Sequence, residues 1–595
     1  MKIWKHLKKL RNIVNKCNER IKPFLQYPFR FSKKNTLTYI LLKLICSFVP
    51  MVTILCIEKF IDIMMFSIQE ENFCKTEIIW IVTLLAVAFS FEWVVENLDY
   101  RVSQLIKLDV LPSFYEIIIE KKRKIGIENY EESETCDLIY RVSSNFAEKI
   151  TNAFVAFVGF VELIIQIGSL LLIVGERVWW SMFVLMLVSI PLVYYSVKFG
   201  EDSYEFDVEI SSINRENEYL TKLLTLRDYA HEKKMFQSWR VLINRWSKTY
   251  REYRVKRNKQ QMKSFVKTKV AGLILDFAAI LIIFIIFYLY IEGLVNISLF
   301  IAYTTAVFNF LSVMSWNFTY YISEVYSGMM FYRDFNNFQL IKNEKIEGIW
   351  IKNISNIEFS HVTFSYPNSD DPVLKDVSMY LKNGQHYAIV GDNGAGKSTF
   401  IKLVLGIYDD YSGMIKINGI DLKKLNKESV RNALGVINQI FGRYNVSVEE
   451  YIFGAENDYD ADKLNNEISE RFGEKLTLKT LLGNIYNEGV NLSGGEWQKL
   501  ALLRLFYQNK ETYIFDEPTA SLDPLMEERV FEDIDKMFKD KLTIVVTHRM
   551  SYVKNADYIY LFSNGKVIEH GVHEGLLNQN GHYALMYNTQ RSLYK

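Results

Sequence analysis

The sequence has little cysteine, little proline and almost no net charge: five Cys and nine Pro occur among 595 residues, and the formal net charge is +1. The cysteines have no metal-ligand spacing, and they occupy positions Cys17, Cys46, Cys56, Cys74 and Cys136. This pattern argues against a disulfide framework. The part of the chain after residue 350 has no cysteine, which is typical of a reducing compartment. Because the charges nearly balance, no global field of one sign favours nucleic acid as a partner.

Long apolar runs, by contrast, fill the first half of the chain. Each is close to the ~20 residues that a helix needs to cross a bilayer. The runs lie at 37–57, 77–95, 152–174, 178–199, 270–291 and 297–319. We therefore predict six membrane spans, with kinks at Pro50 and Pro191. The long polar links 96–151 and 200–269 carry basic clusters, so the positive-inside tendency places them and both termini on the cytoplasmic side of the cell membrane.

A basic segment precedes the first span. Residues 1–34 hold eleven Lys or Arg and a single acid, and apolar residues such as Trp4 and Leu7 recur there at helical spacing. Such a helix is expected to lie in the headgroup region of the bilayer. A solvated basic tail is the alternative. No small-residue cleavage site follows, so we do not expect a signal peptide.

A glycine-rich stretch in the second half fits the pattern of a phosphate-binding loop. It consists of Gly391, Asp392, Asn393, Gly394, Ala395, Gly396, Lys397, Ser398 and Thr399. The apolar strand 386–390 runs into it and the helical run 398–405 leaves it, as the motif requires. Backbone N–H groups would surround a phosphate, Lys397 would neutralise its oxygens and Ser398 would hold Mg²⁺. The alternative is a plain Gly-rich turn.

Two further motifs lie downstream of this loop. An apolar strand, 513–517, ends in Asp516, placed to support Mg²⁺, and Glu517, placed to polarise an attacking water. Upstream of it, a second helix N-terminus able to bind phosphate is opened by Ser493, Gly494, Gly495 and Glu496. We therefore expect ATP and Mg²⁺ as cofactors.

At these residues the chain resembles the ATP-binding cassette transporters. The resemblance implies that Tyr366 stacks on adenine, that Gln439 reaches Mg²⁺ and the attacking water, and that His548 contacts the γ-phosphate. For Tyr366, Phe364 or a plain core role is the alternative. Glu496 departs from the glutamine that is common in the family. Because Glu517 and His548 are intact, we expect a working ATPase.

The implied fold is multidomain: an all-α six-helix transmembrane domain followed by an α/β P-loop ATPase domain. We predict an interfacial helix at 1–34, a transmembrane domain at 35–335, a linker at 336–352 and the ATP-binding cassette domain at 353–595.

The resemblance also implies dimers, since in this family the Ser-Gly-Gly signature of one domain caps the ATP held by another. A homodimer is preferred on symmetry grounds, and a heterodimer stays open. The segments 128–140 and 226–232 look like the short transverse helices that dock on the ATPase domains. Exposed faces of long helices are the alternative.

Acidic residues in or near the spans are the candidates for substrate contact: Glu92, Glu96, Glu162 and Asp276. An ionisable group costs ~2.5–3.5 kcal/mol in hydrocarbon, so it usually faces a cavity or a partner. The acidic excess favours a cationic or amphipathic substrate, while an ion pair with Lys43 is the alternative.

We rank a peptide or bacteriocin-like exporter first and a multidrug or lipid exporter second. An ATP-gated channel or regulator on the same scaffold represents a different class. The 34 residues before the first span are too few for a leader-peptidase domain of ~100 residues, so a peptide cargo is expected to arrive processed.

Overall fold

The computed structural model describes two compact units. One comprises Met1–Ile125 with Glu132–Lys342, and the other comprises Gly126–Glu131 with Asn343–Lys595. The described residues are 25–69, 75–144, 146–226, 229–344, 347–367, 369, 371–454, 461–485, 488–519 and 524–593. Residues 1–24 lie outside them, so the interfacial helix expected at 1–34 stays a prediction.

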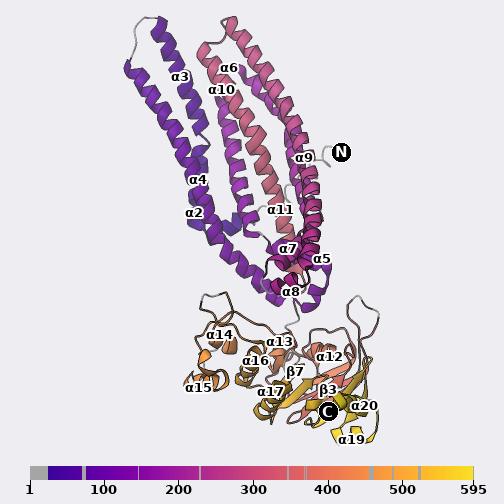
Figure 1. Cartoon of the computed structure of the whole chain (residues 1–595). Helices are drawn as coiled ribbons and strands as arrows, with labels where there is room; N and C mark the ends of the chain where they lie inside the picture. The colour runs from indigo at the N-terminus through magenta and orange to yellow at the C-terminus, as the bar shows by residue number, and fades with distance from the viewer. Residues whose placement is uncertain are drawn as a thin grey trace. The chain divides into compact units, whose positions relative to one another are not determined.

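The first unit is built from helices (Figure 1). In chain order they are α2 (Lys33–Cys46), α3 (Val49–Gln69), α4 (Lys75–Lys124), α5 (Ser133–Ser143), α6 (Phe146–Glu209), α7 (Ser211–Thr225), α8 (Ala230–Met235), α9 (Ser238–Ile291), α10 (Ile297–Ser312), a π-helical turn (Val313–Phe318) and α11 (Thr319–Leu340). Within the described residues, six helical segments are long and apolar enough to cross a membrane, which confirms the six predicted spans.

Helix α6 contains two of these spans. Lys149 and Asp207 form an ion pair at 3.4 Å although 58 residues separate them, a separation that would be ~87 Å along one straight helix. The helical run therefore folds back on itself. The two candidate spans in it, Glu148–Ser169 and Phe183–Glu209, agree with the predicted pair at 152–174 and 178–199.

The predicted kink at Pro50 corresponds to a break between two helices. Helix α2 ends at Cys46 and α3 begins at Val49, so Pro50 lies in the first turn of the new helix. Proline is tolerated there because the first N–H groups of a helix have no intrahelical partner. Pro191 lies inside α6, and a kink at that position stays a prediction.

The second unit contains two sheets. Its strands are β1 (Asn356–Phe364), β2 (Leu374–Lys382), β3 (His386–Gly391), β4 (Ser412–Ile417), β5 (Ile420–Asp421), β6 (Leu434–Ile437), β7 (Thr512–Asp516), β8 (Leu542–Val546), β9 (Tyr558–Ser563) and β10 (Lys566–Gly571). The strand orders are β2-β1-β4-β5 and β10-β9-β3-β8-β7-β6. This α/β unit after a helical unit confirms the predicted fold class.

The second unit also contains helices (Figure 1). They are α12 (Lys397–Val404), α13 (Lys427–Asn432), α14 (Val448–Phe453), α15 (Ala461–Phe472), α16 (Gly494–Gln508), α17 (Pro524–Met537), α18 (Met550–Val553), α19 (His573–Asn578) and α20 (His582–Leu593).

The larger sheet gathers its functional loops at one edge. Strand β3 pairs in parallel with β8, β8 with β7, and β7 with β6. Every residue of β7 and β8 is buried, as expected for parallel strands covered on both faces. Because the strands run in the same direction, the loops at their carboxyl ends meet at one edge, where α/β proteins bind ligands.

The stretch expected to be a linker, 336–352, is partly ordered into its neighbours. Helix α11 extends to Leu340. Further on, Glu344 accepts two hydrogen bonds from Arg431, at 2.6 and 2.5 Å, and Ile349 forms a β-bridge with Leu425. The described residues from Asn343 onward therefore belong to the second unit.

The two segments expected to dock on ATPase domains differ in the structure. A 3₁₀ turn, Ile127–Glu131, groups with the second unit, where the Tyr408 hydroxyl donates to the Glu131 carboxylate at 2.5 Å. Residues 227–228 lie outside the described part of the second segment. Next to them, Lys233 of α8 donates to the Leu223 carbonyl at 2.8 Å, within the first unit.

Candidate nucleotide site

A cavity of about 620 Å³ lies at the carboxyl edge of the larger sheet. It is lined by Val373, Asn393, Gly394, Ala395, Gly396, Lys397, Ser398, Thr399, Gln439, Glu517 and His548. These residues come from the loop after β3 and the first turn of α12, and from the loops after β6, β7 and β8, with Val373 just before β2. The structure thus brings the predicted phosphate loop and the three predicted catalytic residues into one cavity.

The phosphate loop needs its glycines. Gly391 has φ 149° and Gly396 has φ 101°, and a Cβ on Gly391 would lie 2.2 Å from the Phe562 carbonyl oxygen. Only glycine meets both conditions without strain. The loop then delivers Lys397 to the N-terminus of α12, a position suited to anions.

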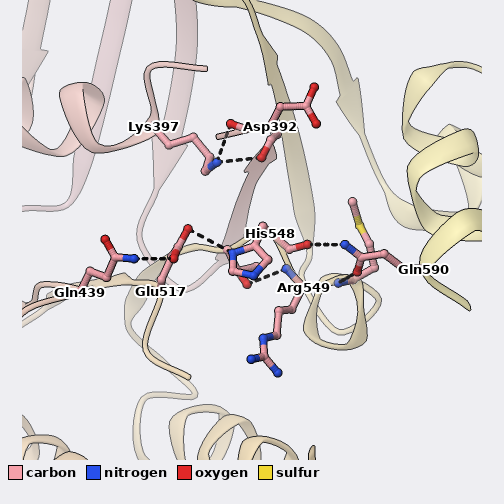
Figure 2. A network of polar contacts seen from close by, with 10 residues as sticks. Asp392, Lys397, Gln439, Glu517, His548, Arg549 and Gln590 are labelled. Carbon is pink, nitrogen blue, oxygen red and sulfur yellow. Dashed lines mark hydrogen bonds and ion pairs between the residues drawn. The ribbon is translucent and has the colours of Figure 1, made fainter. Parts of the chain in front are cut away.

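Lys397 is buried and is held by main-chain oxygens. Its Nζ donates to the carbonyls of Gly391 at 2.7 Å and Asp392 at 2.9 Å (Figure 2). Burial lowers the pKa of Lys397, and the nearby charges of Glu517, Asp392 and Asp516 oppose this change. An anion in the cavity would supply the negative charge that favours a protonated lysine.

Asp516 ends strand β7 and is 8% exposed. Burial, together with the adjacent charge of Glu517, raises the pKa of the Asp516 carboxyl, whereas a hydrogen bond from Ser398 lowers it. Ser398 and Asp516 therefore present oxygens side by side, the donor type that Mg²⁺ requires. A cation bound beside Asp516 would stabilise the ionised form of its carboxylate.

Glu517 is held by two side chains and by its own main chain. Gln439 Nε2 donates to Glu517 Oε2 at 2.9 Å, and His548 Nδ1 lies 3.1 Å from Glu517 Oε1 (Figure 2). The Glu517 N–H donates to the Val546 carbonyl at 2.8 Å, and Glu517 has φ 47°, in the left-handed region. Such strain persists only where the surroundings impose it, and it is common at active sites.

Tyr366 is placed beside the cavity and does not line it. Its hydroxyl lies 2.9 Å from the Thr399 hydroxyl, and Lys402 Nζ lies 4.8 Å above its ring. The ring also packs edge-to-face on Phe364 and Tyr408. Adenine stacking by Tyr366 stays a prediction.

The signature residues begin α16. The Ser493 side chain accepts from the Glu496 N–H, and the Glu496 carboxylate accepts from the Ser493 N–H at 2.7 Å, which makes a capping box. Lys475 binds Glu496 at 2.8 Å and is the main reason that the pKa of Glu496 is lowered. Glu or Gln can complete a capping box, which accounts for the Glu at this position.

Among the described residues, none of the four signature residues lines the cavity formed by the phosphate loop. Ser493, Gly494, Gly495 and Glu496 therefore do not complete that cavity.

The acidic candidates in the spans lie in different surroundings. Glu162 is 8% exposed and binds Lys43 at 3.0 Å, as the ion-pair alternative required. Lys43 also binds Asp99, a residue that sequence analysis missed, at 3.2 Å. The triad joins α2, α4 and α6.

The other three acids do not share this arrangement. Glu96 is exposed and Asp276 is half-buried, and neither forms an ion pair with another described residue. The side chain of Glu92 lies outside the described part of the structure.

Comparison with known proteins finds a family match within the second unit and longer matches to individual proteins. The family described as ABC transporter matches residues 374–520. The subtilin transport ATP-binding protein SpaT of Bacillus subtilis is 26% identical over 571 residues, covering 92% of this chain and 90% of that protein. The nisin transport ATP-binding protein NisT of Lactococcus lactis is 24% identical over 588 residues and covers 95% of each.

Other matches are shorter or structural. An ATP-dependent lipid A-core flippase of Coxiella burnetii is 36% identical over 241 residues, covering 39% of this chain and 40% of that protein. A solved structure of a bacterial Atm1-family ABC exporter with ATP bound has a TM-score of 0.77 and 19% sequence identity, and covers 94% of this chain and 98% of that one. It supports the fold of the whole chain.

Proposed function

This chain belongs to the ATP-binding cassette transporters, and we propose that it exports a peptide or amphipathic substrate across the cytoplasmic membrane at the expense of ATP. One observation carries the proposal: residues from four strand-end loops meet in a cavity of about 620 Å³, in a chain that also has six candidate spans. Hydrolysis of ATP bound in this cavity would supply the free energy for transport.

We assign the residues of the cavity as follows. Lys397 and the N–H groups of the phosphate loop bind the phosphates of ATP. Ser398 and Asp516 would hold Mg²⁺ with help from Gln439, and a bound ion would supply positive charge beside the phosphate oxygens. Glu517 orients and deprotonates the attacking water.

Two side chains support Glu517 in this assignment. Gln439 donates to one carboxylate oxygen at 2.9 Å and, as a neutral amide, holds that oxygen without transferring a proton to it. His548 lies 3.1 Å from the other oxygen, and we assign to it the contact with the γ-phosphate.

A second copy of the chain is the proposed partner. The signature helix α16 starts with Ser493 outside the cavity of its own chain. The Glu496 N–H is bound by Ser493, whereas the N–H groups of Gly494 and Gly495 have no acceptor among the described residues and lie at the positive end of the helix dipole. Two copies placed head to tail would give each cavity the signature of the other chain.

A cationic amphipathic peptide is the proposed cargo. The matches to the subtilin and nisin transport proteins span more than 90% of this chain, so they include the spans where a substrate would pass. The match to the lipid A-core flippase covers 39% of this chain. Lipid export is therefore the second candidate.

Transport assays test the proposal. Inside-out vesicles that contain the protein and ATP should accumulate a labelled cationic amphipathic peptide above its outside concentration, and vesicles with Glu517→Gln should not. Flipping of labelled lipid without peptide accumulation would favour the second candidate. ATP-dependent ion conductance without accumulation of either would establish a channel and refute the exporter.

A further inference from the structure

The loop that carries His548, here called the switch loop (547–550), leaves the sheet just before the histidine. The Thr547 N–H still donates to the Ile389 carbonyl at 3.1 Å and so continues the pairing of β8 with β3. After Thr547 the main chain has left the ladder, so something other than a strand must fix His548.

Gln590 of α20 binds the main chain on both sides of Arg549. Its Nε2 donates to the His548 carbonyl at 2.7 Å, and its Oε1 accepts from the Met550 N–H at 3.0 Å (Figure 2). A strand partner makes the same pair of bonds to residues i and i+2. Among side chains, only Asn and Gln carry a donor and an acceptor in one amide group.

Helix α20 is anchored without help from Gln590. Tyr583 is fully buried in a core that includes Ala388 and Val390 of β3, the strand that leads into the phosphate loop. Tyr587 packs against the same core, and the spacing of Tyr583, Tyr587 and Gln590 places them on one helix face. Gln590 itself is half-buried, so its loss should not detach the helix.

The rest of the switch loop is tied elsewhere. The Arg549 guanidinium binds Glu527 of α17, which is 5% exposed, and the Arg549 N–H donates to Thr547 Oγ1 at 3.0 Å. The His548 side chain, 44% exposed, is the part that remains directed toward Glu517 and the cavity.

We propose that Gln590 is a positioning residue, which clamps the main chain of the switch loop and so holds the His548 ring against Glu517 at the edge of the cavity. The proposal rests on the role of His548 in the proposed function. It makes α20 part of the ATPase machinery, because the helix connects the switch loop to the core behind the phosphate loop.

The test is Gln590→Met, which keeps the length of the side chain and removes both hydrogen bonds. We expect the basal ATPase kcat of the full-length protein to fall about tenfold, since each bond contributes a few-fold. The KM for ATP should change by less than about threefold, because the phosphate loop is untouched. Asn588→Met, at an exposed amide two residues earlier on the same helix, is the matched control and should leave kcat unchanged.

A double-mutant cycle separates positioning from a general role in folding. In a His548→Ala background, Gln590→Met should lower kcat by less than about twofold, because the group that it positions is gone. Suppose that His548→Ala is itself impaired. An unchanged kcat in Gln590→Met, or an equal loss of kcat in both backgrounds, then overturns the positioning role of Gln590 and leaves the proposed function standing. A fully active His548→Ala protein overturns the inference together with the role of His548 in the proposed function.

Discussion

Gln439 and Glu517 are joined by a hydrogen bond of 2.9 Å between two loops at neighbouring strand ends. Strands β6 and β7 are parallel, and their register places Ile437 opposite Phe515, two residues before each partner. The bond therefore follows from the sheet itself. It fixes one oxygen of the proposed general base and leaves the other facing His548, which makes the separate roles of binding and hydrolysis testable.

Lys397→Ala and Glu517→Gln should have different defects. Lys397→Ala removes the charge that neutralises phosphate, so we expect loss of ATP binding. Glu517→Gln keeps the shape of the site but cannot accept a proton, so ATP should still bind while turnover falls roughly 100-fold or more. Nucleotide binding and phosphate release measured on the same purified samples distinguish the two. Undiminished turnover by Glu517→Gln would remove Glu517 from the role of base.

Mixed dimers test whether two chains share each site. If Ser493 serves nucleotide on the other chain, mixing Lys397→Ala chains with Ser493→Arg chains should leave one site built from two undamaged halves. Mixed dimers isolated with two affinity tags should then show ATPase above either parent. Ser493→Arg also removes a helix cap, which costs about 1 kcal/mol, so its thermal stability must be checked. Inactive mixed dimers of demonstrated composition would contradict a shared site.

The acids in the spans should tune the response to substrate. Glu162→Gln with Asp276→Asn is expected to weaken stimulation of ATPase by cationic peptides several-fold while basal turnover remains, if the carboxylates attract cations. Folding should survive, because Lys43 keeps Asp99 as a partner at 3.2 Å. Stimulation is measured with cationic, neutral and anionic amphiphiles. An unchanged preference for cations removes both residues from the substrate path, and a loss of folded protein would favour a role in folding, such as the pairing of Glu162 with Lys43.

Stability should depend on pH through His386. Burial alone lowers the pKa of His386, but its interaction with Asp535, 3.5 Å away on α17, and the charge of Asp557 outweigh burial and raise the pKa. The folded state then binds the proton more tightly than the unfolded one. This contribution is complete below the unfolded pKa of ~6.5 and is lost as pH rises through the folded pKa.

The measurement is the unfolding temperature of the purified protein across this pH range. It should fall as pH rises, and Asp535→Asn should flatten that part of the slope because the histidine loses the carboxylate that holds its proton. A slope equal to that of the unsubstituted protein would show that Asp535 is not the cause.

The sequence was most informative where function depends on neighbours in the chain. The phosphate loop, the pair Asp516 and Glu517, and the six spans are local patterns, and the structure has each of them. His548 and Gln439 come from separate loops, and the family resemblance was needed to connect them with Glu517. The parallel sheet then explains why these loops meet.

Contacts between distant segments could not be predicted. Gln590 lies 42 residues after His548 in an ordinary amphipathic helix, and no local pattern marks its amide. Asp99 lies beyond the predicted end of its span. An apolar run indicates how deep a residue lies in the membrane, but it does not indicate which face of the helix meets its neighbours, so the contact of Asp99 with Lys43 was not predicted. Glu496 looked unusual beside the family pattern until the capping box and Lys475 gave it two partners.

The backbone of Glu517 has a consequence for how this site can change during evolution. At a φ of 47°, Gly, Asn and Asp are accommodated readily, whereas Val, Ile and Thr would be strongly strained. Substitutions that replace Glu517 and preserve the fold should therefore favour Gly, Asn and Asp. A chain altered in this way would still fold and bind nucleotide, so it would be a catalytically impaired subunit in a heterodimer.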